Sequence, residues 1–216
     1  DVCSSDLEAE GRNTAPAATL AALAYLGAGD DPLLLVLPAD HLIEDADEFR
    51  RCVDAACSYA EQGEFVTFGV APRAAETGYG YIRHAGPMDG GESGAAEAYR
   101  LDRFVEKPDA DTAREYVESG EYLWNSGMFL FRASRFVQEL ERWRPEIVGC
   151  CREALAGSRA DLDFVRLDAD ALGRCPSDSI DYAVMEHLER GVVVPLNAGW
   201  SDIGSWAGLA QVSSGD

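Results

Sequence analysis

Aliphatic runs and helical stripes alternate along the first third of the chain. Residues 33–37 (LLLVL) are continuously aliphatic, and residues 65–70 form a second run of the same kind. An alanine-rich helix is predicted over residues 14–26, and residues 46–62 carry apolar positions on one helical stripe. Strands that are apolar on both faces and separated by helices are typical of βαβ units. We therefore predict a mostly parallel sheet, with residues 33–37 as a strand inside it.

The pattern then changes. Two strand-like runs, residues 79–83 and 99–105, flank a loop of glycine and acidic residues at 86–95, which predicts an antiparallel excursion with an exposed tip. Further helices are expected over residues 109–119, 133–143, 145–155, 179–188 and 205–212. Further strands are expected over residues 128–131 and 192–196, whereas residues 157–175 give no clear prediction.

The charge of the chain excludes one class of partner. With 39 acidic and 18 basic side chains the net charge is -21, and no basic stripe is present to neutralise the phosphates of a nucleic acid. A phosphorylated substrate would need a local cation or a divalent metal against this field. The aliphatic run at residues 33–37 is far too short to span a bilayer, so no membrane partner is expected.

The six cysteines form no C-x-x-C pair. Cys52, Cys57 and Cys150 fall within apolar helical patterns, and we predict them to be small core residues. This usage favours a reduced, cytoplasmic setting.

Two motifs place polar side chains in apolar surroundings. FVEKP (residues 104–108) sets Glu106 and Lys107 at the end of a strand-like run, and LWNSGMF (residues 123–129) sets Asn125 just before another. Such groups in an apolar wall suit the floor of a pocket for a polyhydroxylated or phosphorylated ligand. Lys107 suits a phosphate and Glu106 suits sugar hydroxyls. The alternative is a buried loop beside a surface ion pair.

Two aspartates are candidate metal ligands. Asp40 directly follows the strand at residues 33–37, where open α/β sheets bind ligands, and Asp202 lies in a glycine-flanked turn after the strand at residues 192–196. Two carboxylates with substrate phosphates are a usual Mg²⁺ arrangement. Either aspartate could instead cap a helix, and His41 is interpreted as structural.

Gly78 and Gly80 flank Tyr79 and would allow a ligand to approach the backbone closely, although the motif by itself favours an ordinary glycine-rich strand entry. The serines and aspartate of residues 177–179 could face a site or cap a helix.

Seven segments, taken in order, resemble the sugar-nucleotide pyrophosphorylases, and within them the bacterial mannose-1-phosphate guanylyltransferase family, including its bifunctional type with an isomerase domain. The segments are EGRNTAPA (10–17), LLLVLPADH (33–41), ETGYGYI (76–82), FVEKP (104–108), YLWNSGMFLF (122–131), CPSDSIDYAVME (175–186) and AGWSDIGSW (198–206).

The resemblance implies an α/β fold with a Rossmann-like doubly wound mixed sheet of the nucleotidyltransferase type. It implies that mannose 1-phosphate and GTP are joined to give GDP-mannose and pyrophosphate. The residues that match the family's functional positions are Asp40 and Asp202 for Mg²⁺, Lys107 for the sugar-side phosphate, Glu106, Asn125, Gly78, Tyr79 and Gly80 for the sugar, and Asn13 and Thr14 for the nucleotide base. A homo-oligomer is left open.

The chain departs from the family at its beginning. The glycine-rich G-x-G-x-R-L-W-P loop that grips the triphosphate is absent. One back-translation of residues 1–7 (DVCSSDL) matches a common sequencing-adapter tail, so we expect those residues to be non-native and residues 8–216 to be a partial nucleotidyltransferase domain. We expect this fragment to have negligible activity and, with an apolar sheet edge unpaired, poor solubility.

Two other readings stay open: a pyrophosphorylase for another sugar 1-phosphate, and a catalytically silent homologue that binds sugar nucleotides. A Rossmann oxidoreductase is disfavoured, because no G-x-G-x-x-G follows a strand.

Overall fold

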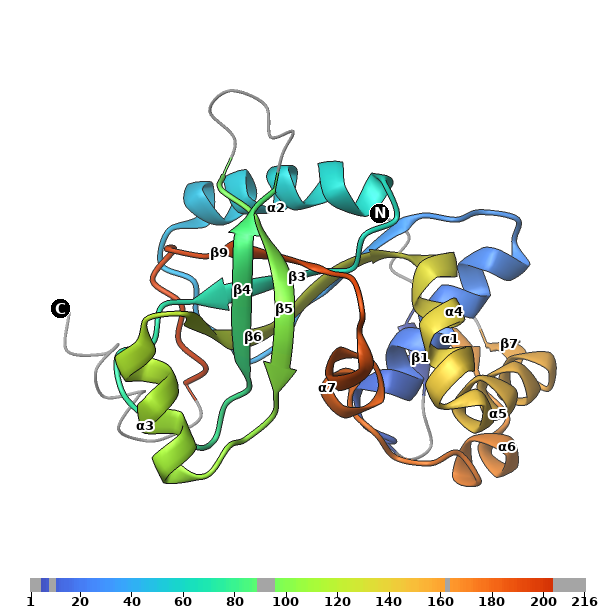
Figure 1. The fold of residues 1–216 in the computed structure, drawn as a ribbon. Coiled ribbons are helices and arrows are strands. Elements are labelled where there is room, and N and C mark those ends of the chain that lie inside the picture. Colours follow the sequence, from blue (N-terminus) through green and yellow to red (C-terminus); the bar gives the residue numbers. More distant parts are fainter. Residues whose placement is uncertain (1–4, 8–10, 89–95, 162–163, 204–216) are drawn as a thin grey trace, which may run out of the picture. The chain divides into compact units, whose positions relative to one another are not determined.

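The computed structural model describes residues 5–7, 11–88, 96–161 and 164–203, which fall into two compact units (Figure 1). The first unit comprises Asp1–Leu34 and Arg132–Leu188, and the second comprises Leu35–Phe131 and Glu189–Asp216. Three features of the sequence lie outside the described residues: Cys3, the tip of the acidic loop, and the helix predicted over residues 205–212.

The first unit is mostly helical. Its helix α1 packs against the helices α4, α5 and α7, and buries Leu20 against a core that includes Phe136, Leu140 and Ile147. Its helices are α1 (Thr14–Gly27), α4 (Ala133–Trp143), α5 (Pro145–Ala156), α6 (Ala169–Gly173) and α7 (Ile180–Ala183), followed by the 3₁₀ helix η1 (Met185–His187). The prediction of one helix over residues 179–188 is wrong, because Val184 leaves helical geometry with φ -127°.

A small sheet of order β1-β8-β7 belongs to the same unit. The strand β1 (Ser5–Leu7) pairs in parallel with β8 (Phe164–Arg166), which pairs antiparallel with β7 (Arg159–Asp161). The strand β1 falls in the segment expected to be non-native, and that origin stays a prediction.

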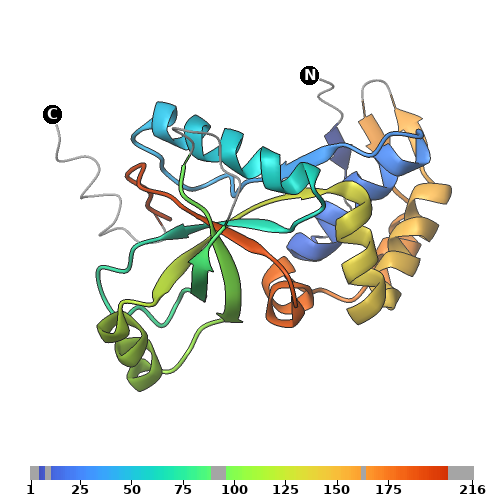
Figure 2. The same cartoon turned by 45° about the horizontal axis from the view of Figure 1, so that its top comes forward.

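The second unit is built on a six-stranded sheet of order β2-β6-β3-β9-β5-β4. Helix α2 packs against β3 and β9 (Figure 1), and α3 connects β5 to β6 (Figure 2). The elements are β2 (Leu33–Val36), α2 (Ala46–Glu61), β3 (Val66–Val70), β4 (Tyr81–Pro87), β5 (Tyr99–Val105), α3 (Ala110–Ser119), β6 (Tyr122–Arg132) and β9 (Val192–Pro195).

The sheet is mixed, as the resemblance implies, but the expectation of a mostly parallel sheet is wrong. Strand β3 pairs in parallel with β9, whereas the pairs β3–β6, β4–β5, β4–β6 and β5–β9 are antiparallel. The predicted antiparallel excursion supplies the reason. The strands β4 and β5 form a hairpin, and β6 returns beside β3 in the opposite direction.

Strand β2 lies at the end of the sheet order rather than inside the sheet. Its side chains are only partly covered: Leu35 is 37% exposed, and Leu37, just after the strand, is 46% exposed. The prediction of an interior strand is therefore wrong for this chain. A continuous aliphatic run was correctly assigned as a strand, but its place in the sheet depends on its neighbours.

We expect this edge to drive self-association of the 216-residue chain, because an exposed aliphatic edge strand is a template for pairing with another chain. Leu35→Lys should lower the average mass in analytical ultracentrifugation at high protein concentration. Tyr25→Lys is the control, since Tyr25 is 41% exposed on helix α1 rather than on a sheet edge. Equal association of both variants and the parent chain would show that β2 is not the associating surface.

Strand β6 is longer than predicted and includes Asn125, Ser126 and Gly127, which were expected to precede it. Gly127 adopts a left-handed φ of 71°, and the register of β6 against β3 shifts between Thr67 and Gly69. The strand therefore continues through an irregularity that sequence periodicity does not show.

The described cysteines are free thiols. Cys52 is fully buried, as predicted, and burial raises its pKa to about 11. Cys57 and Cys150 are only half-buried, so the prediction that they are core residues is wrong. Within the described residues, every helix is too short or too polar to cross a membrane.

Candidate active site

Three predicted sugar-binding residues meet at the start of β4. Gly80 is buried between the side chains of the other two: a Cβ placed on it would lie 2.5 Å from Glu106 Oε2 and 3.2 Å from Asn125 Cβ. The Gly80 carbonyl also accepts a hydrogen bond from the Asn125 backbone N–H at 2.8 Å. The fold thus brings together residues from three separate sequence motifs.

The Asn125 side chain is held from β3. Its Oδ1 lies 3.2 Å from Thr67 Oγ1 and accepts a hydrogen bond from the Gly127 N–H at 3.3 Å. Asn125 is 8% exposed and Thr67 is fully buried. Packing and hydrogen bonding therefore fix the amide in one orientation, which is what recognition of a hydroxyl-bearing ligand requires.

Lys107 lies beside this cluster with an unusual backbone. Its φ is 46°, a left-handed value that a lysine rarely adopts, and its N–H donates to the Tyr79 carbonyl at 3.2 Å. Its Nζ lies 3.3 Å from Glu106 Oε1, and the Glu106 side chain is 9% exposed. Lys107 thus combines a strained backbone with a positive charge beside a nearly buried carboxylate. Backbone strain of this kind is typical of functional sites.

The two candidate metal ligands lie on backbone segments that pair with each other. Asp40 follows β2 and its side chain is 85% exposed, whereas Asp202 is half-buried. Between them an isolated antiparallel bridge joins Leu42 and Ser201 through hydrogen bonds of 2.8 and 3.1 Å. Burial lowers the pKa of His41, and the charges of both carboxylates oppose that lowering without reversing it.

His41 and Tyr79 are the titratable neighbours of these carboxylates. Burial, the largest influence, lowers the pKa of His41 despite the charges of Asp40 and Asp202. Burial, followed by the hydrogen bond to Asp202, raises the pKa of Tyr79 well above its usual value. The lowered pKa favours the neutral imidazole, and the raised pKa keeps the Tyr79 hydroxyl protonated beside the Asp202 carboxylate.

The donor set fits a divalent cation of the Mg²⁺ type. Two carboxylates on paired segments supply hard oxygen ligands, and Mg²⁺ usually binds one or two carboxylates and completes its shell with water and phosphate. Within the described ranges, His, Cys, Asp and Glu side chains form no cluster of three or more that could hold a metal ion by itself. The arrangement thus suits a cation shared with a phosphorylated substrate.

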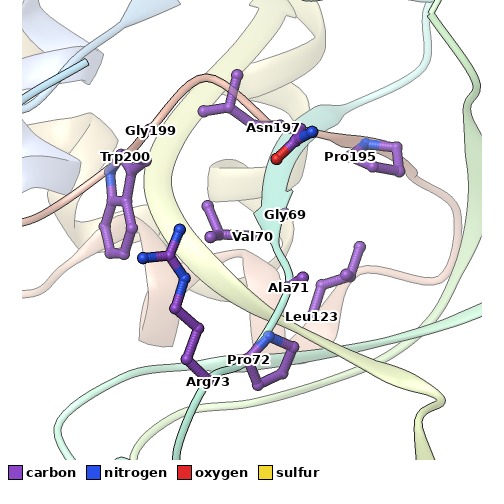
Figure 3. A pocket seen from close by; sticks show the side chains of 11 residues that line it. Gly69, Val70, Ala71, Pro72, Arg73, Leu123, Pro195, Asn197, Gly199 and Trp200 are labelled. Atoms are coloured by element: carbon purple, nitrogen blue, oxygen red, sulfur yellow. The ribbon is translucent and has the colours of Figure 1, made fainter. Parts of the chain in front are cut away.

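A pocket of about 230 Å³ opens at the ends of β3 and β9 (Figure 3). Leu123, Pro72 and Pro195 form apolar walls, and the Arg73 guanidinium points toward the ring of Trp200. The predicted site residues are not among its lining residues, so this pocket does not test the expectation that Asn125 forms a pocket floor. Leu123 of the same motif does line it.

The remaining predicted residues are placed differently. Gly78 is exposed, and among the described atoms nothing lies within 4 Å of a Cβ built on it. Asn13 and Thr14 belong to the first unit, where Thr14 Oγ1 accepts from the Ile180 N–H at 3.0 Å and Asn13 caps α1. In the same unit Ser179 caps α7, which confirms the capping alternative for that residue. The proposed roles of Asn13, Thr14 and Gly78 stay predictions.

Sequence reasoning missed three residues of the site. Thr67 contacts the Asn125 amide oxygen, Trp200 contacts His41 and Tyr79, and His41, for which the sequence favours a structural role, accepts a hydrogen bond from Trp200. Trp200 lies directly between Gly199 and Ser201-Asp202 in the segment AGWSDIGSW (198–206), and this place next to a candidate metal ligand could have identified it. Thr67 gave none, because it is one polar residue within a buried strand.

Comparison with known proteins gives the family of the chain. The Nucleotidyl transferase family model matches residues 3–216. The Xanthan biosynthesis protein XanB of Xanthomonas campestris pv. campestris (strain B100) is 56% identical over 97% of this chain and 43% of its own length. A mannose-1-phosphate guanylyltransferase of Salmonella muenchen is 54% identical over 97% of this chain and 44% of its own length.

A solved structure from Thermus thermophilus, described as a mannose-1-phosphate geranyltransferase, superposes with a TM-score of 0.80. It is 38% identical and is matched over 97% of this chain and 58% of its own. The chain spans less than half the length of the two curated relatives described above, XanB and the Salmonella enzyme. The fold, the identity and the matched range together show that the chain belongs to the nucleotidyl transferase family.

Proposed function

We propose that this chain supplies the sugar-phosphate and metal-binding part of a nucleotidyltransferase that joins mannose 1-phosphate and GTP to form GDP-mannose and pyrophosphate. The observation that carries the proposal is the convergence of Gly80, Glu106 and Asn125 beside Lys107. The similarity to mannose-1-phosphate guanylyltransferase supports the choice of substrates.

The proposed reaction is an in-line displacement at phosphorus. A phosphate oxygen of mannose 1-phosphate forms a bond to the α-phosphorus of GTP, and the bond from that phosphorus to the bridging oxygen of the pyrophosphate breaks. The protein contributes positioning and charge neutralisation. Glu106 would accept hydrogen bonds from sugar hydroxyls, Asn125 would fix the orientation of the sugar, and Lys107 would pair with the sugar phosphate.

Asp40 and Asp202 would hold Mg²⁺. The ion would supply positive charge against the phosphates, which the acidic protein otherwise repels, since the net charge of the chain is -21. A cytoplasmic location is proposed because the described cysteines are free thiols, which are typical of a reducing compartment.

The test is isothermal titration of the 216-residue chain with mannose 1-phosphate in the presence of Mg²⁺. Lys107→Met should weaken binding by about 10-fold or more, since hydrogen bonds to charged groups contribute ~1.5–3 kcal/mol. Arg73→Met is the matched control: it also removes one positive charge from the second unit, at an exposed residue outside the predicted site.

A loss of binding confined to Arg73→Met would move the ligand to the pocket of Figure 3 and contradict the proposal. Tighter binding of glucose 1-phosphate than of mannose 1-phosphate would favour a pyrophosphorylase for another sugar. Turnover is tested with the longer native gene product by pyrophosphate release. Binding without turnover there would identify a silent sugar-nucleotide-binding homologue.

A further inference from the structure

Trp200 fixes the protonation pattern of His41. Its indole Nε1, which can only donate, lies 3.1 Å from His41 Nδ1. Nδ1 must therefore be the unprotonated acceptor, and the imidazole proton must lie on Nε2. The two rings meet edge to face at a centroid separation of 5.4 Å, which holds the imidazole in this orientation.

The protonated side of His41 faces a candidate metal ligand. His41 Nε2 lies 3.9 Å from Asp40 Oδ1, within the range of electrostatic attraction although longer than a direct hydrogen bond. The His41 side chain is 17% exposed, whereas that of Asp40 is 85% exposed. A well-packed ring thus presents an N–H to a carboxylate that is otherwise free to rotate in solvent.

Trp200 also contacts Tyr79, a neighbour of the second carboxylate. The ring of Tyr79 packs edge to face against Trp200 at 5.7 Å and against Trp124 at 5.1 Å. Burial, and after it the Asp202 carboxylate, raises the pKa of Tyr79, so its hydroxyl keeps the proton that it can offer to Asp202. Two indoles therefore hold the ring whose hydroxyl interacts with Asp202.

The backbone reinforces the same arrangement. Besides the Leu42–Ser201 bridge, the N–H groups of Glu44 and Asp45 both donate to the Ala198 carbonyl at 3.0 Å. Trp200 lies within this paired segment and is 8% exposed. One buried indole thus touches the neighbours of both carboxylates and is itself held by the pairing that brings them together.

We propose that Trp200 is a positioning residue which, through His41 and Tyr79, sets the carboxylates of Asp40 and Asp202 for one divalent cation. The inference rests on the proposed function, in which those carboxylates bind Mg²⁺. Partners that orient metal ligands commonly change metal affinity by about 10–100-fold when they are removed. A purely space-filling tryptophan would affect stability but neither the tautomer of His41 nor the affinity for the cation.

The first test is titration of the intact chain with Mn²⁺, with binding measured by the relaxation rate of the water protons. Trp200→Phe and Tyr79→Phe, which keep an aromatic ring and remove the N–H or the hydroxyl, should each weaken Mn²⁺ binding by about 10-fold or more. Asp202→Asn should abolish it. Trp143→Phe is the control, because Trp143 also stacks on a histidine, His187, at 4.6 Å but in the first unit.

The outcomes separate the two proposals. If Asp202→Asn abolishes binding while Trp200→Phe and Tyr79→Phe bind Mn²⁺ like the parent chain, the metal site stands and the positioning role is overturned. If Asp202→Asn binds like the parent chain, or the parent chain binds no Mn²⁺, the proposed metal site is wrong and the positioning role falls with it.

The second test reads the tautomer directly from the ¹⁵N spectrum of histidine-labelled protein. The parent chain should show His41 with a proton on Nε2 and an unprotonated Nδ1, and Trp200→Phe should give a mixture of tautomers. An unchanged tautomer in Trp200→Phe would overturn the proposal, whatever the effect on stability.

Discussion

Gly80→Ala should destabilise the second unit and remove its affinity for sugar phosphates. The added Cβ would lie 2.5 Å from Glu106 Oε2, 2.8 Å from Phe104 Cζ and 3.2 Å from Asn125 Cβ. Phe104 is a buried core ring, so it cannot move aside cheaply. Overpacking of this kind costs about 1–3 kcal/mol, which is a fall in melting temperature of about 2–12 °C for a chain of this size.

Gly78→Ala is the matched control for this substitution. Gly78 belongs to the same motif, but its added Cβ would meet no described atom within 4 Å. We expect a change in the free energy of unfolding within about 0.5 kcal/mol and unchanged binding of mannose 1-phosphate, measured by thermal melting and titration calorimetry. Equal melting temperatures for Gly80→Ala and the parent chain would show that the three side chains are not packed as described.

Gly199→Ala should separate the two segments that carry the candidate metal ligands. Gly199 has a φ of 65°, and its added Cβ would lie 2.7 Å from Glu44 Oε2 and 2.8 Å from Glu44 Cβ. The left-handed backbone costs an L-residue about 1–2 kcal/mol, and the clash adds about 1–3 kcal/mol. Because the Glu44 Cβ cannot swing away, the Leu42–Ser201 bridge should open and Mn²⁺ affinity should fall.

Gly63→Ala isolates the backbone contribution. Gly63 also has a left-handed φ, 84°, but among the described atoms nothing lies within 4 Å of its added Cβ. The Gly63→Ala variant should lose only the ~1–2 kcal/mol of stability that a left-handed backbone costs an L-residue, and it should keep its Mn²⁺ affinity. If denaturant unfolding gives the same loss for both variants, the approach of Glu44 to Gly199 contributes nothing to the stability of the site.

The candidate sugar-binding residues and the candidate metal ligands differ in burial. The sugar-side residues Glu106 and Asn125 are nearly buried and packed, whereas Asp40 is exposed and depends on its neighbours for orientation. A buried group is positioned by its packing and its internal hydrogen bonds, but an exposed carboxylate needs a partner to restrict its rotation. This difference explains why the positioning network lies on the metal side.

The sequence by itself determined most of the helices and strands and named the candidate site residues. Apolar periodicity and capping residues are local, so α1, α2 and α4 were predicted nearly to their ends. The motif around Lys107 and Glu106 was recognisable because its residues are contiguous. The capping alternative for the Ser177–Ser179 run holds at Ser179, since capping also depends only on neighbours.

The tertiary structure alone decided the order of the strands in the sheet and the partners of the site residues. Residues 33–37 were predicted to be an interior strand, yet β2 lies at the edge, because the burial of a strand depends on which strands flank it. Thr67 and Trp200 entered the site for the same reason: each lies far along the chain from the side chain it orients. Local pattern cannot specify contacts across such separations, because many pairings of the same strands satisfy it and only packing of the whole unit selects one.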